Sequence, residues 1–410
     1  MNGKILLISW TLPPEPTGSA VIVGNLAKQF SADEMVVAGE RPYRRPSVSW
    51  RDNWPRLMYI ASALPPTWRG ARWWRRLQLP LMLWRSMSLV RKYQCSVVVV
   101  VFPNEEFLLV GYLTALWTGA PLFAYFHNTY VENRRGLSFR FARWLQARVF
   151  SRARHVFVMS KAMVGLYRER YPELSCSALV HSFNEDVPEF ASPPEPRSPL
   201  RLTICGNINE SCRDATLRIC DALSRTEDVS LTLLSGTSRT DLQQLGLLRN
   251  GTRHETVSRD EVVRRLGEAD IVVLPHGLTG KCSAVEYRTM FPTKTIEYLI
   301  CGRPILAHTP PDSYLTRFLK EHNCALVVDQ PSVQKLVEAV ERLRTEPQLR
   351  SSLIRGALRA AETFHAPRVA MSLRAYLHSN GNGCSDERYS KSHFVIKNKC
   401  RREVNEDPEG

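Results

Sequence analysis

Short apolar runs alternate along this chain with longer segments that repeat their hydrophobic positions at helical spacing. The clearest run is Cys95–Phe102, which holds five consecutive valines and is typical of a strand covered on both faces. Runs of this kind, separated by helical segments, predict an α/β architecture built on parallel sheets. The predicted strands are 4–9, 34–38, 95–102, 122–126, 155–159, 201–205, 230–235, 271–274 and 305–307.

Helical periodicity fills most of the intervals between these strands. Ser258 and Glu261 form a capping box that predicts a helix start, and Ser160 is placed to cap a helix after the strand at 155–159. The predicted helices are 19–30, 215–224, 258–267, 292–301, 333–344, 348–363 and 367–378.

The proline-rich stretch 191–200 is the strongest candidate for a domain boundary. The alternation of strands and helices stops before it and restarts after it, which predicts a first domain at 1–190 and a second at 201–365. A helical segment at 366–380 follows, and the polar segment 381–410 is predicted to be disordered. Two α/β domains joined by a linker predict a cleft between them, where ligands of such proteins usually bind.

The segment 291–308, FPTKTIEYLICGRPILAH, places a cation where helix electrostatics disfavour one. It predicts a helix that begins at Pro292 and ends before Gly302, and Lys294 falls in the first turn, where the helix dipole disfavours a cation by ~0.3–1 kcal/mol. A bound phosphate would pair with Lys294 and the free amides, and Glu297 could then accept hydrogen bonds from sugar hydroxyls. An exposed Lys–Glu pair explains the same spacing, so both interpretations stay open.

Other glycine and polar residues follow predicted strands, at the edge of the sheet where ligands of α/β proteins bind. A glycine there lets the backbone approach a bound group, and a serine can cap the next helix. Each position also has an ordinary explanation as a turn glycine, a solvated arginine or a structural histidine. The candidates of this kind are Gly18, Ser19, His127, Gly206, Asn207, Arg213 and His276.

The formal charge of +15 is distributed unevenly. Residues 41–92 hold twelve cations against one acid, together with six of the nine tryptophans, and residues 134–154 add arginines without any acid. Because each cation near an anionic leaflet contributes about 1 kcal/mol and tryptophan prefers the interface, 68–93 predicts a membrane-facing patch, with Pro80 interrupting any helix. Core tryptophans with solvated arginines, or a nucleic-acid footprint, account for the same composition.

Several classes of chemistry lack their motifs. The sequence has no Asp-x-Asp pair, no GxxxxGK[ST] loop, no GxSxG elbow and no HExxH helix, so we expect neither a metal nor a cofactor. Ten cysteines without a CxxC motif indicate free thiols in a reducing cytosol. No signal peptide is recognisable and no apolar run reaches the ~18 residues of a membrane span, which predicts a cytoplasmic protein.

The stretches PPEPTGSA, FHNTY, LTICGNI and, most specifically, FPTKTIEYLICGRPILA resemble the group 1, or family four, retaining glycosyltransferases of GT-B fold. The resemblance spans most of residues 3–378. It implies two Rossmann-like domains that face a central cleft, with the helix at 366–380 crossing back to the first domain. It also implies that Glu297 holds the ribose of a nucleotide-sugar donor, that Lys294 and Arg213 hold the diphosphate beside Thr293, and that His127 orients the sugar or the acceptor.

The function implied by this resemblance is transfer of a sugar from a nucleotide diphosphate to an acceptor hydroxyl with retention of configuration. The basic tryptophan-rich segment would suit a lipid-linked or polysaccharide-precursor acceptor, in a protein peripheral at the inner face of the membrane. The chain departs from the family at Thr289, where many members carry a second glutamate, and Glu286 is near but out of register. A GT-B nucleotide-sugar 2-epimerase, a catalytically inactive relative and a nucleic-acid-binding protein are the alternatives.

Overall fold

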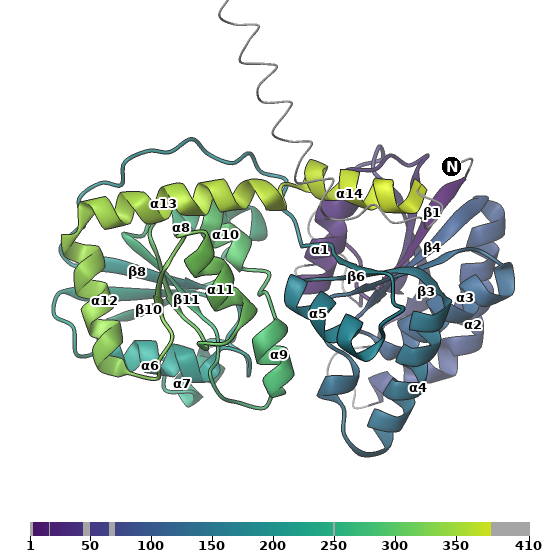
Figure 1. Cartoon of the computed structure of the whole chain (residues 1–410), viewed down its shortest axis with the longest axis horizontal. Coiled ribbons are helices and arrows are strands. Elements are labelled where there is room, and N and C mark those ends of the chain that lie inside the picture. Colours follow the sequence, from purple (N-terminus) through teal and green to yellow (C-terminus); the bar gives the residue numbers. More distant parts are fainter. Residues whose placement is uncertain (1–2, 16, 44–49, 65–69, 249–250, 379–410) are drawn as a thin grey trace, which may run out of the picture.

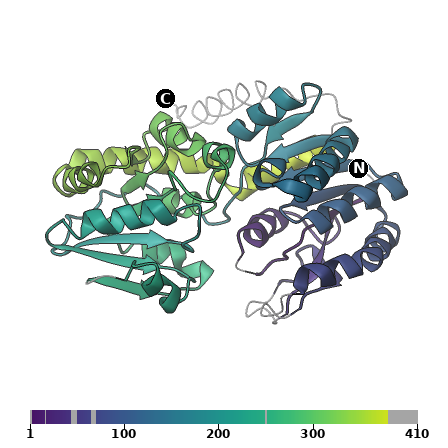
Figure 2. The same cartoon turned by 90° about the horizontal axis from the view of Figure 1, so that it is seen from below.

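A computed structural model describes residues 3–15, 17–43, 50–64, 70–248 and 251–378. The predicted disordered tail at 381–410 and part of the basic segment, at 44–49 and 65–69, lie outside the described residues. Two α/β domains stand side by side in the described part (Figure 1), and Figure 2 shows the same arrangement from below. The predicted architecture of two parallel-sheet domains is confirmed.

The first domain is built on a parallel sheet of seven strands in the order β3-β2-β1-β4-β5-β6-β7. The valine-rich run at 95–102 is the central strand, as its continuous hydrophobicity predicts, because helices cover both faces of the sheet. The strands are β1 Lys4–Ile8, β2 Met35–Arg41, β3 Arg56–Ser62, β4 Cys95–Phe102, β5 Leu122–Phe126, β6 Ala153–Val158 and β7 Cys176–Ala178.

The helices of the first domain follow its strands. The side chain of Asn104 accepts a hydrogen bond from the Phe107 amide and starts one helix, and Ser160 caps another as predicted. The elements are α1 Gly18–Ala27, α2 Ala71–Lys92, α3 Glu105–Thr118, the 3-10 turn η1 Val131–Asn133, α4 Gly136–Arg152 and α5 Lys161–Arg170.

The prediction that Pro80 interrupts any helix is wrong. Pro80 lies inside α2, which continues through it from Ala71 to Lys92. The ring is exposed, and a proline in a helix interior removes one backbone hydrogen bond at a cost of ~3 kcal/mol. Packing of the inner side of this long helix on α3, β3 and β4 offsets that cost.

The second domain holds a parallel sheet of six strands in the order β10-β9-β8-β11-β12-β13. Its strands are β8 Leu200–Cys205, β9 Val229–Leu234, β10 Thr252–Glu255, β11 Ile271–Pro275, β12 Ile305–His308 and β13 Leu326–Val328. Its helices and 3-10 turns are α6 Arg213–Leu223, α7 Arg239–Gln244, η2 Arg259–Glu261, α8 Val262–Leu266, α9 Ala284–Thr289, α10 Thr295–Ile300, α11 Tyr314–Glu321, α12 Val333–Thr345, α13 Pro347–Ala361 and η3 Glu362–Phe364.

Two helices begin elsewhere than predicted. Thr17 is the N-cap of α1, so Ser19 lies inside the helix and does not cap it. The amide of Thr295 donates to the carbonyl of Pro292 at 3.0 Å, which makes 292–294 a turn and leaves Lys294 as the N-cap of α10. Lys294 therefore lies at the start of a helix, as predicted, but that helix is shorter than the sequence indicated.

The chain crosses between the domains twice, and the two crossings are hydrogen-bonded to each other. The amide of Phe183 donates to the carbonyl of Phe364 at 3.2 Å, and the amide of Ala366 donates to Phe183 at 2.8 Å. Beyond this pairing, α14 Ala366–His378 packs against α1 of the first domain, where Arg374 donates to the carbonyl of Gln29 at 2.6 Å. The predicted return of the last helix to the first domain is confirmed.

Candidate functional site

Lys294 lies across the glycine loop that follows β8. Gly206 has a φ of +102°, and a Cβ placed on it would lie 3.3 Å from the Cδ atom of Lys294. The lysine is half-buried, and among the described residues none accepts a hydrogen bond from its Nζ atom or forms an ion pair with it. Its positive charge also lowers the pKa of His276, although burial is the larger cause of that shift, to about 4.

The first domain faces this loop with the start of α1. A Cβ placed on Gly18 would lie 3.9 Å from the Oγ1 atom of Thr293, so these two residues oppose each other across the domain boundary. Ser19 follows, and its Oγ atom lies 3.0 Å from the Nδ1 atom of His127 at the end of β5. The structure thus brings together Gly18, Ser19 and His127 from one domain with Thr293 from the other.

His127 is neutral at neutral pH. Its side chain is buried, and burial together with the neighbouring His181 lowers the pKa of His127 to about 3. Its Nε2 atom is buried and has no hydrogen-bond partner among the described residues. A buried nitrogen left unpaired costs ~1–3 kcal/mol, so this ring has an unused hydrogen-bonding position beside the start of α1.

Glu297 is fixed by an arginine that the sequence analysis did not single out. The carboxylate is buried, and burial raises the pKa of Glu297 while the guanidinium of Arg259 opposes that shift. Arg259 comes from η2 and forms an ion pair with Glu297. Apart from this pair, neither carboxylate oxygen accepts a hydrogen bond from the described residues. Only the capping box at 258–261 marked this place in the sequence.

Three further candidate residues form polar contacts within the second domain. Arg213 is the first residue of α6, where its guanidinium lies 3.8 Å from the carboxylate of Glu210 and remains exposed. The Oδ1 atom of Asn207 accepts a hydrogen bond from the amide of Gly236 at 3.0 Å. His276 is buried, with its Nε2 atom 3.0 Å from the Tyr287 carbonyl. Donor binding by these three remains a prediction.

Glu286 connects the two domains. Its buried carboxylate accepts hydrogen bonds from the side-chain amides of Asn128 at 2.9 Å and Asn133 at 3.0 Å, and from the amide and hydroxyl of Thr129. We refer to Glu286 and these three partners as the domain clasp. The sequence placed Glu286 near the family's glutamate position but gave no sign that it reaches the loop after β5.

Thr289, which stands where many family members have a glutamate, faces its own helix. Its hydroxyl donates to the carbonyl of Val285 at 2.8 Å. Its own carbonyl accepts a hydrogen bond from the hydroxyl of Ser160 at 2.6 Å, which adds a second polar contact between the domains beside the clasp. The hydroxyl proton of Thr289 is therefore used within α9.

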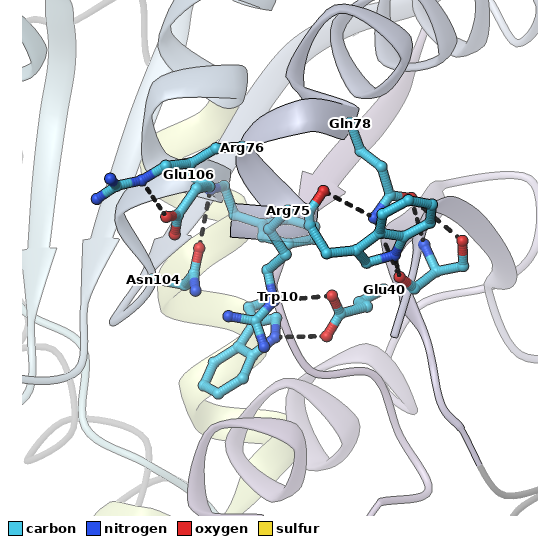
Figure 3. Close-up of polar contacts among 10 residues, drawn as sticks. Trp10, Glu40, Arg75, Arg76, Gln78, Asn104 and Glu106 are labelled. Carbon is cyan, nitrogen blue, oxygen red and sulfur yellow. Dashed lines mark hydrogen bonds and ion pairs between the residues drawn. The ribbon is translucent and has the colours of Figure 1, made fainter. Parts of the chain in front are cut away.

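The basic helix α2 is held to its domain by polar contacts on one side (Figure 3). Glu40 accepts hydrogen bonds at 2.8 Å from both the Trp10 indole and the Arg75 guanidinium, which also stacks over the Trp10 ring at 4.8 Å. The amide of Gln78 bonds to Ser62 at the end of β3. These contacts pair Arg75 and Gln78 of α2 with β2, β3 and the loop after β1.

The opposite side of α2 exposes large apolar side chains. Trp73, Leu77 and Trp84 have 69%, 74% and 66% of their surface exposed. Since α3 packs between α2 and α4, we group the exposed apolar residues of these three helices as the aromatic face. It consists of Trp73, Trp74, Leu77, Leu81, Trp84, Leu116, Trp117, Leu137, Phe139, Phe141 and Trp144. No helix in the described ranges is both long and apolar enough to span a bilayer.

Comparison with known proteins adds independent information. A family model described as a glycosyl transferase 4-like domain matches residues 17–174, and one described as glycosyl transferase-like matches residues 214–372. No curated protein matches the sequence.

Solved structures of similar fold cover nearly the whole chain. HepE from Anabaena, in complex with UDP-glucose, is 14% identical with a TM-score of 0.67, over 92% of this chain and 100% of that one. Sucrose-phosphate synthase from Thermosynechococcus elongatus is 14% identical with a TM-score of 0.69, over 92% and 98%. The trehalose-phosphate synthase from Burkholderia xenovorans is 12% identical with a TM-score of 0.61, over 91% and 100%. At these identities the likeness concerns the fold.

Proposed function

Because the chain belongs to the group 1, or family four, glycosyltransferases of GT-B fold, as a hexosyltransferase-type enzyme, we propose that it uses a nucleotide diphosphate sugar as donor. The sugar passes to an acceptor hydroxyl with retention of configuration. HepE, a structural neighbour, was solved with UDP-glucose and with UDP, which supports this class of donor.

The observation that carries the proposal is the unpaired ammonium of Lys294 beside the Gly206 loop. A half-buried cation without a partner in the described part of the chain favours an anionic ligand. Because Gly206 has no side chain, a diphosphate can approach the loop backbone closely. The ammonium would then stabilise the negative charge that develops on the leaving diphosphate during transfer.

The first domain supplies the other wall of the site. Gly18 faces Thr293 and leaves the start of α1 open to the donor, and Ser19 holds His127 through the Nδ1 atom. The neutral imidazole can orient a sugar hydroxyl through Nε2, which has no partner among the described residues. Glu297, held by Arg259, is the acceptor that we assign to the ribose hydroxyls.

Nucleotide binding by a charge-neutral variant tests the proposal. Titration calorimetry with UDP, GDP and ADP should show binding of at least one of them to the wild type. Lys294→Gln removes one charge-assisted hydrogen bond, worth ~1.5–3 kcal/mol, and should weaken that binding by about tenfold to a hundredfold. Lys281→Gln is the matched control, since Lys281 is 83% exposed in the same domain. Equal affinities of the two variants would contradict the assignment of Lys294.

The Gly206 loop offers a second arm of the same experiment. Gly206→Ala introduces a Cβ at positive φ against Lys294, whereas Gly246→Ala introduces one at a φ of +69° with no heavy atom within 4 Å. An alanine at the φ of +69° costs ~1–2 kcal/mol. The φ of +102° at Gly206 lies outside the left-handed helical region, so Gly206→Ala carries at least that much backbone strain. Only Gly206→Ala should lose nucleotide affinity, and loss in both would attribute the effect to strain instead.

Product analysis separates transfer from the alternative of a nucleotide-sugar 2-epimerase. Incubated with the donor alone, a transferase returns it unchanged or slowly hydrolysed. A 2-epimer of the donor sugar formed without any acceptor would replace the proposed reaction.

We further propose that the acceptor is lipid-linked, or a polysaccharide precursor held at the inner membrane surface, where the enzyme is peripheral. The aromatic face supports this proposal because it presents tryptophan rings on helices that also carry exposed cations. Tryptophan prefers the membrane interface and arginine is attracted to anionic lipids.

A further inference from the structure

A cavity of about 480 Å³ is lined by residues of both domains, and neither Lys294 nor Gly206 is among them. Its walls come from η1, α4 and the end of α5 in the first domain. Val285, at the start of α9, lines it from the second domain. The next residue, Glu286, belongs to the domain clasp, so cavity and clasp share one segment of the chain.

Two buried hydrogen-bond acceptors in the cavity wall have no donor in the described part of the chain. The side chain of Glu132 is 2% exposed, and Arg170 pairs with its Oε1 atom while its Oε2 atom has no partner among the described residues. Gln146 is 1% exposed; its amide nitrogen lies 3.4 Å from the Tyr171 hydroxyl, and its Oε1 atom likewise has no partner there. Both oxygens belong to lining residues and require hydrogen-bond donors.

The remaining lining residues favour a ring that carries negative charge. Arg143 lies on α4 and forms no ion pair with any described residue. Phe139 and Tyr171 add aromatic surface to the wall. A matching ligand would offer hydroxyl donors, an apolar ring surface and one anionic group. A sugar that bears a phosphate or a carboxylate has all three.

We propose that this cavity binds an anionic sugar unit of the acceptor, with ring hydroxyls donating to Glu132 and Gln146 and the anionic group paired with Arg143. The inference rests on the proposed transferase function, because it assigns a subsite to the acceptor. It differs from the donor site in its residues and its place. Because Val285 lines the cavity, an occupant would also lie beside the segment that carries Glu286.

The test uses the full chain saturated with the nucleotide diphosphate that binds most tightly. Saturation-transfer NMR then measures binding of glucuronate and of glucose 1-phosphate, with glucose and inorganic phosphate as fragment controls. We expect at least one anionic sugar to bind better than either fragment. Arg143→Gln should weaken that binding by about tenfold, the effect of losing one charge-assisted contact. Gln146→Leu, which removes the amide oxygen, should weaken it as well.

Arg148→Gln is the matched control, because Arg148 is an exposed arginine of the same helix outside the cavity wall. It removes the same charge from α4 and should leave sugar binding unchanged. Equal effects of Arg143→Gln and Arg148→Gln, or no binding of either anionic sugar to the wild type, would overturn the proposal. A loss caused by Lys294→Gln instead would assign the sugar to the donor site and also overturn it.

The two proposals fail separately. Nucleotide binding is measured on the same samples, so intact nucleotide binding without sugar binding rejects only the acceptor subsite. If no nucleotide diphosphate binds, the donor proposal fails whatever the sugar does.

Discussion

At the scale of single residues, burial keeps four histidines of this protein unprotonated at neutral pH. Desolvation lowers the pKa of His127 and His181 to about 3 and the pKa of His155 and His276 to about 4. These rings are neutral at pH 7. For His127 this means that the side chain acts in the site as a neutral hydrogen-bonding group, without titrating near neutral pH.

The same shifts predict an acid-sensitive fold. A histidine whose pKa falls from 6.5 in the unfolded chain to about 4 in the folded protein contributes stability above pH 6.5, which is lost as the pH falls toward 4. The loss is ~1.4 kcal/mol per pH unit for each such group. His276→Gln removes one titrating group while retaining a side-chain donor for the Tyr287 carbonyl.

We therefore expect urea unfolding between pH 6.5 and 5.5 to show a loss of unfolding free energy that is ~1 kcal/mol larger in the wild type than in His276→Gln. The variant's lower stability at pH 7.5 does not affect this comparison, because only the change with pH is measured. If the unfolding free energy of both proteins changes equally with pH, the pKa of His276 is not lowered by folding, and the prediction is wrong.

Much of the candidate site could be placed from sequence because its residues follow strands. In parallel sheets the ends of strands meet at one edge, so Gly18, His127 and Gly206 were expected near the cleft. Arg259 could not be found this way. It reaches Glu297 from a position 38 residues earlier in the chain, and only the packing of α8, which follows η2, against α10 brings the two together.

At the scale of elements, the domain clasp joins α9 to the loop after β5. Glu286 accepts four hydrogen bonds there as a carboxylate, which offers no donor of its own. In Glu286→Gln the new NH₂ group cannot accept a hydrogen bond from the donor that it would face. That donor would be left unpaired, at a cost of ~1–3 kcal/mol. We predict that hydrogen–deuterium exchange of residues 127–133 becomes at least about fivefold faster in this variant.

Glu268→Gln is the control for that experiment. Its carboxylate is exposed and pairs with Arg264 and Arg265 within the second domain. Exchange of 127–133 should remain at the wild-type rate in the control. Equal acceleration in both variants would show that the clasp does not restrain the loop.

Sequence analysis missed the long helices α2, α3 and α4 and several short elements without a complete pattern of their own. β3 is an edge strand whose residues are mostly partly exposed, and its pairing with β2 defines it. α9 has only six residues, too few to show helical periodicity, and its start depends on Ser283 accepting a hydrogen bond from the Glu286 amide. The long, continuous runs such as β4 and β5 were found with their bounds intact.

At the scale of the whole molecule, the aromatic face predicts binding to anionic membranes. Flotation with vesicles containing phosphatidylserine at moderate salt should carry the wild type upward. Replacing both Trp73 and Trp84 by serine should remove most of this binding, because each ring loses its interfacial contact. Met371→Ser, an exposed apolar residue on α14, is the control and should float like the wild type. A wild type that stays in the dense fraction would reject the membrane proposal.

The paired crossings at Phe183 and Phe364–Ala366 also constrain how the domains can separate. Two covalent connections bonded to each other at one edge act as a pivot, so displacement grows with distance from them. Figure 1 places α9 and α4 at the opposite edge from α14. A rotation about these crossings would therefore displace α9, and with it the contacts of Glu286 with the first domain, more than the contacts beside α14.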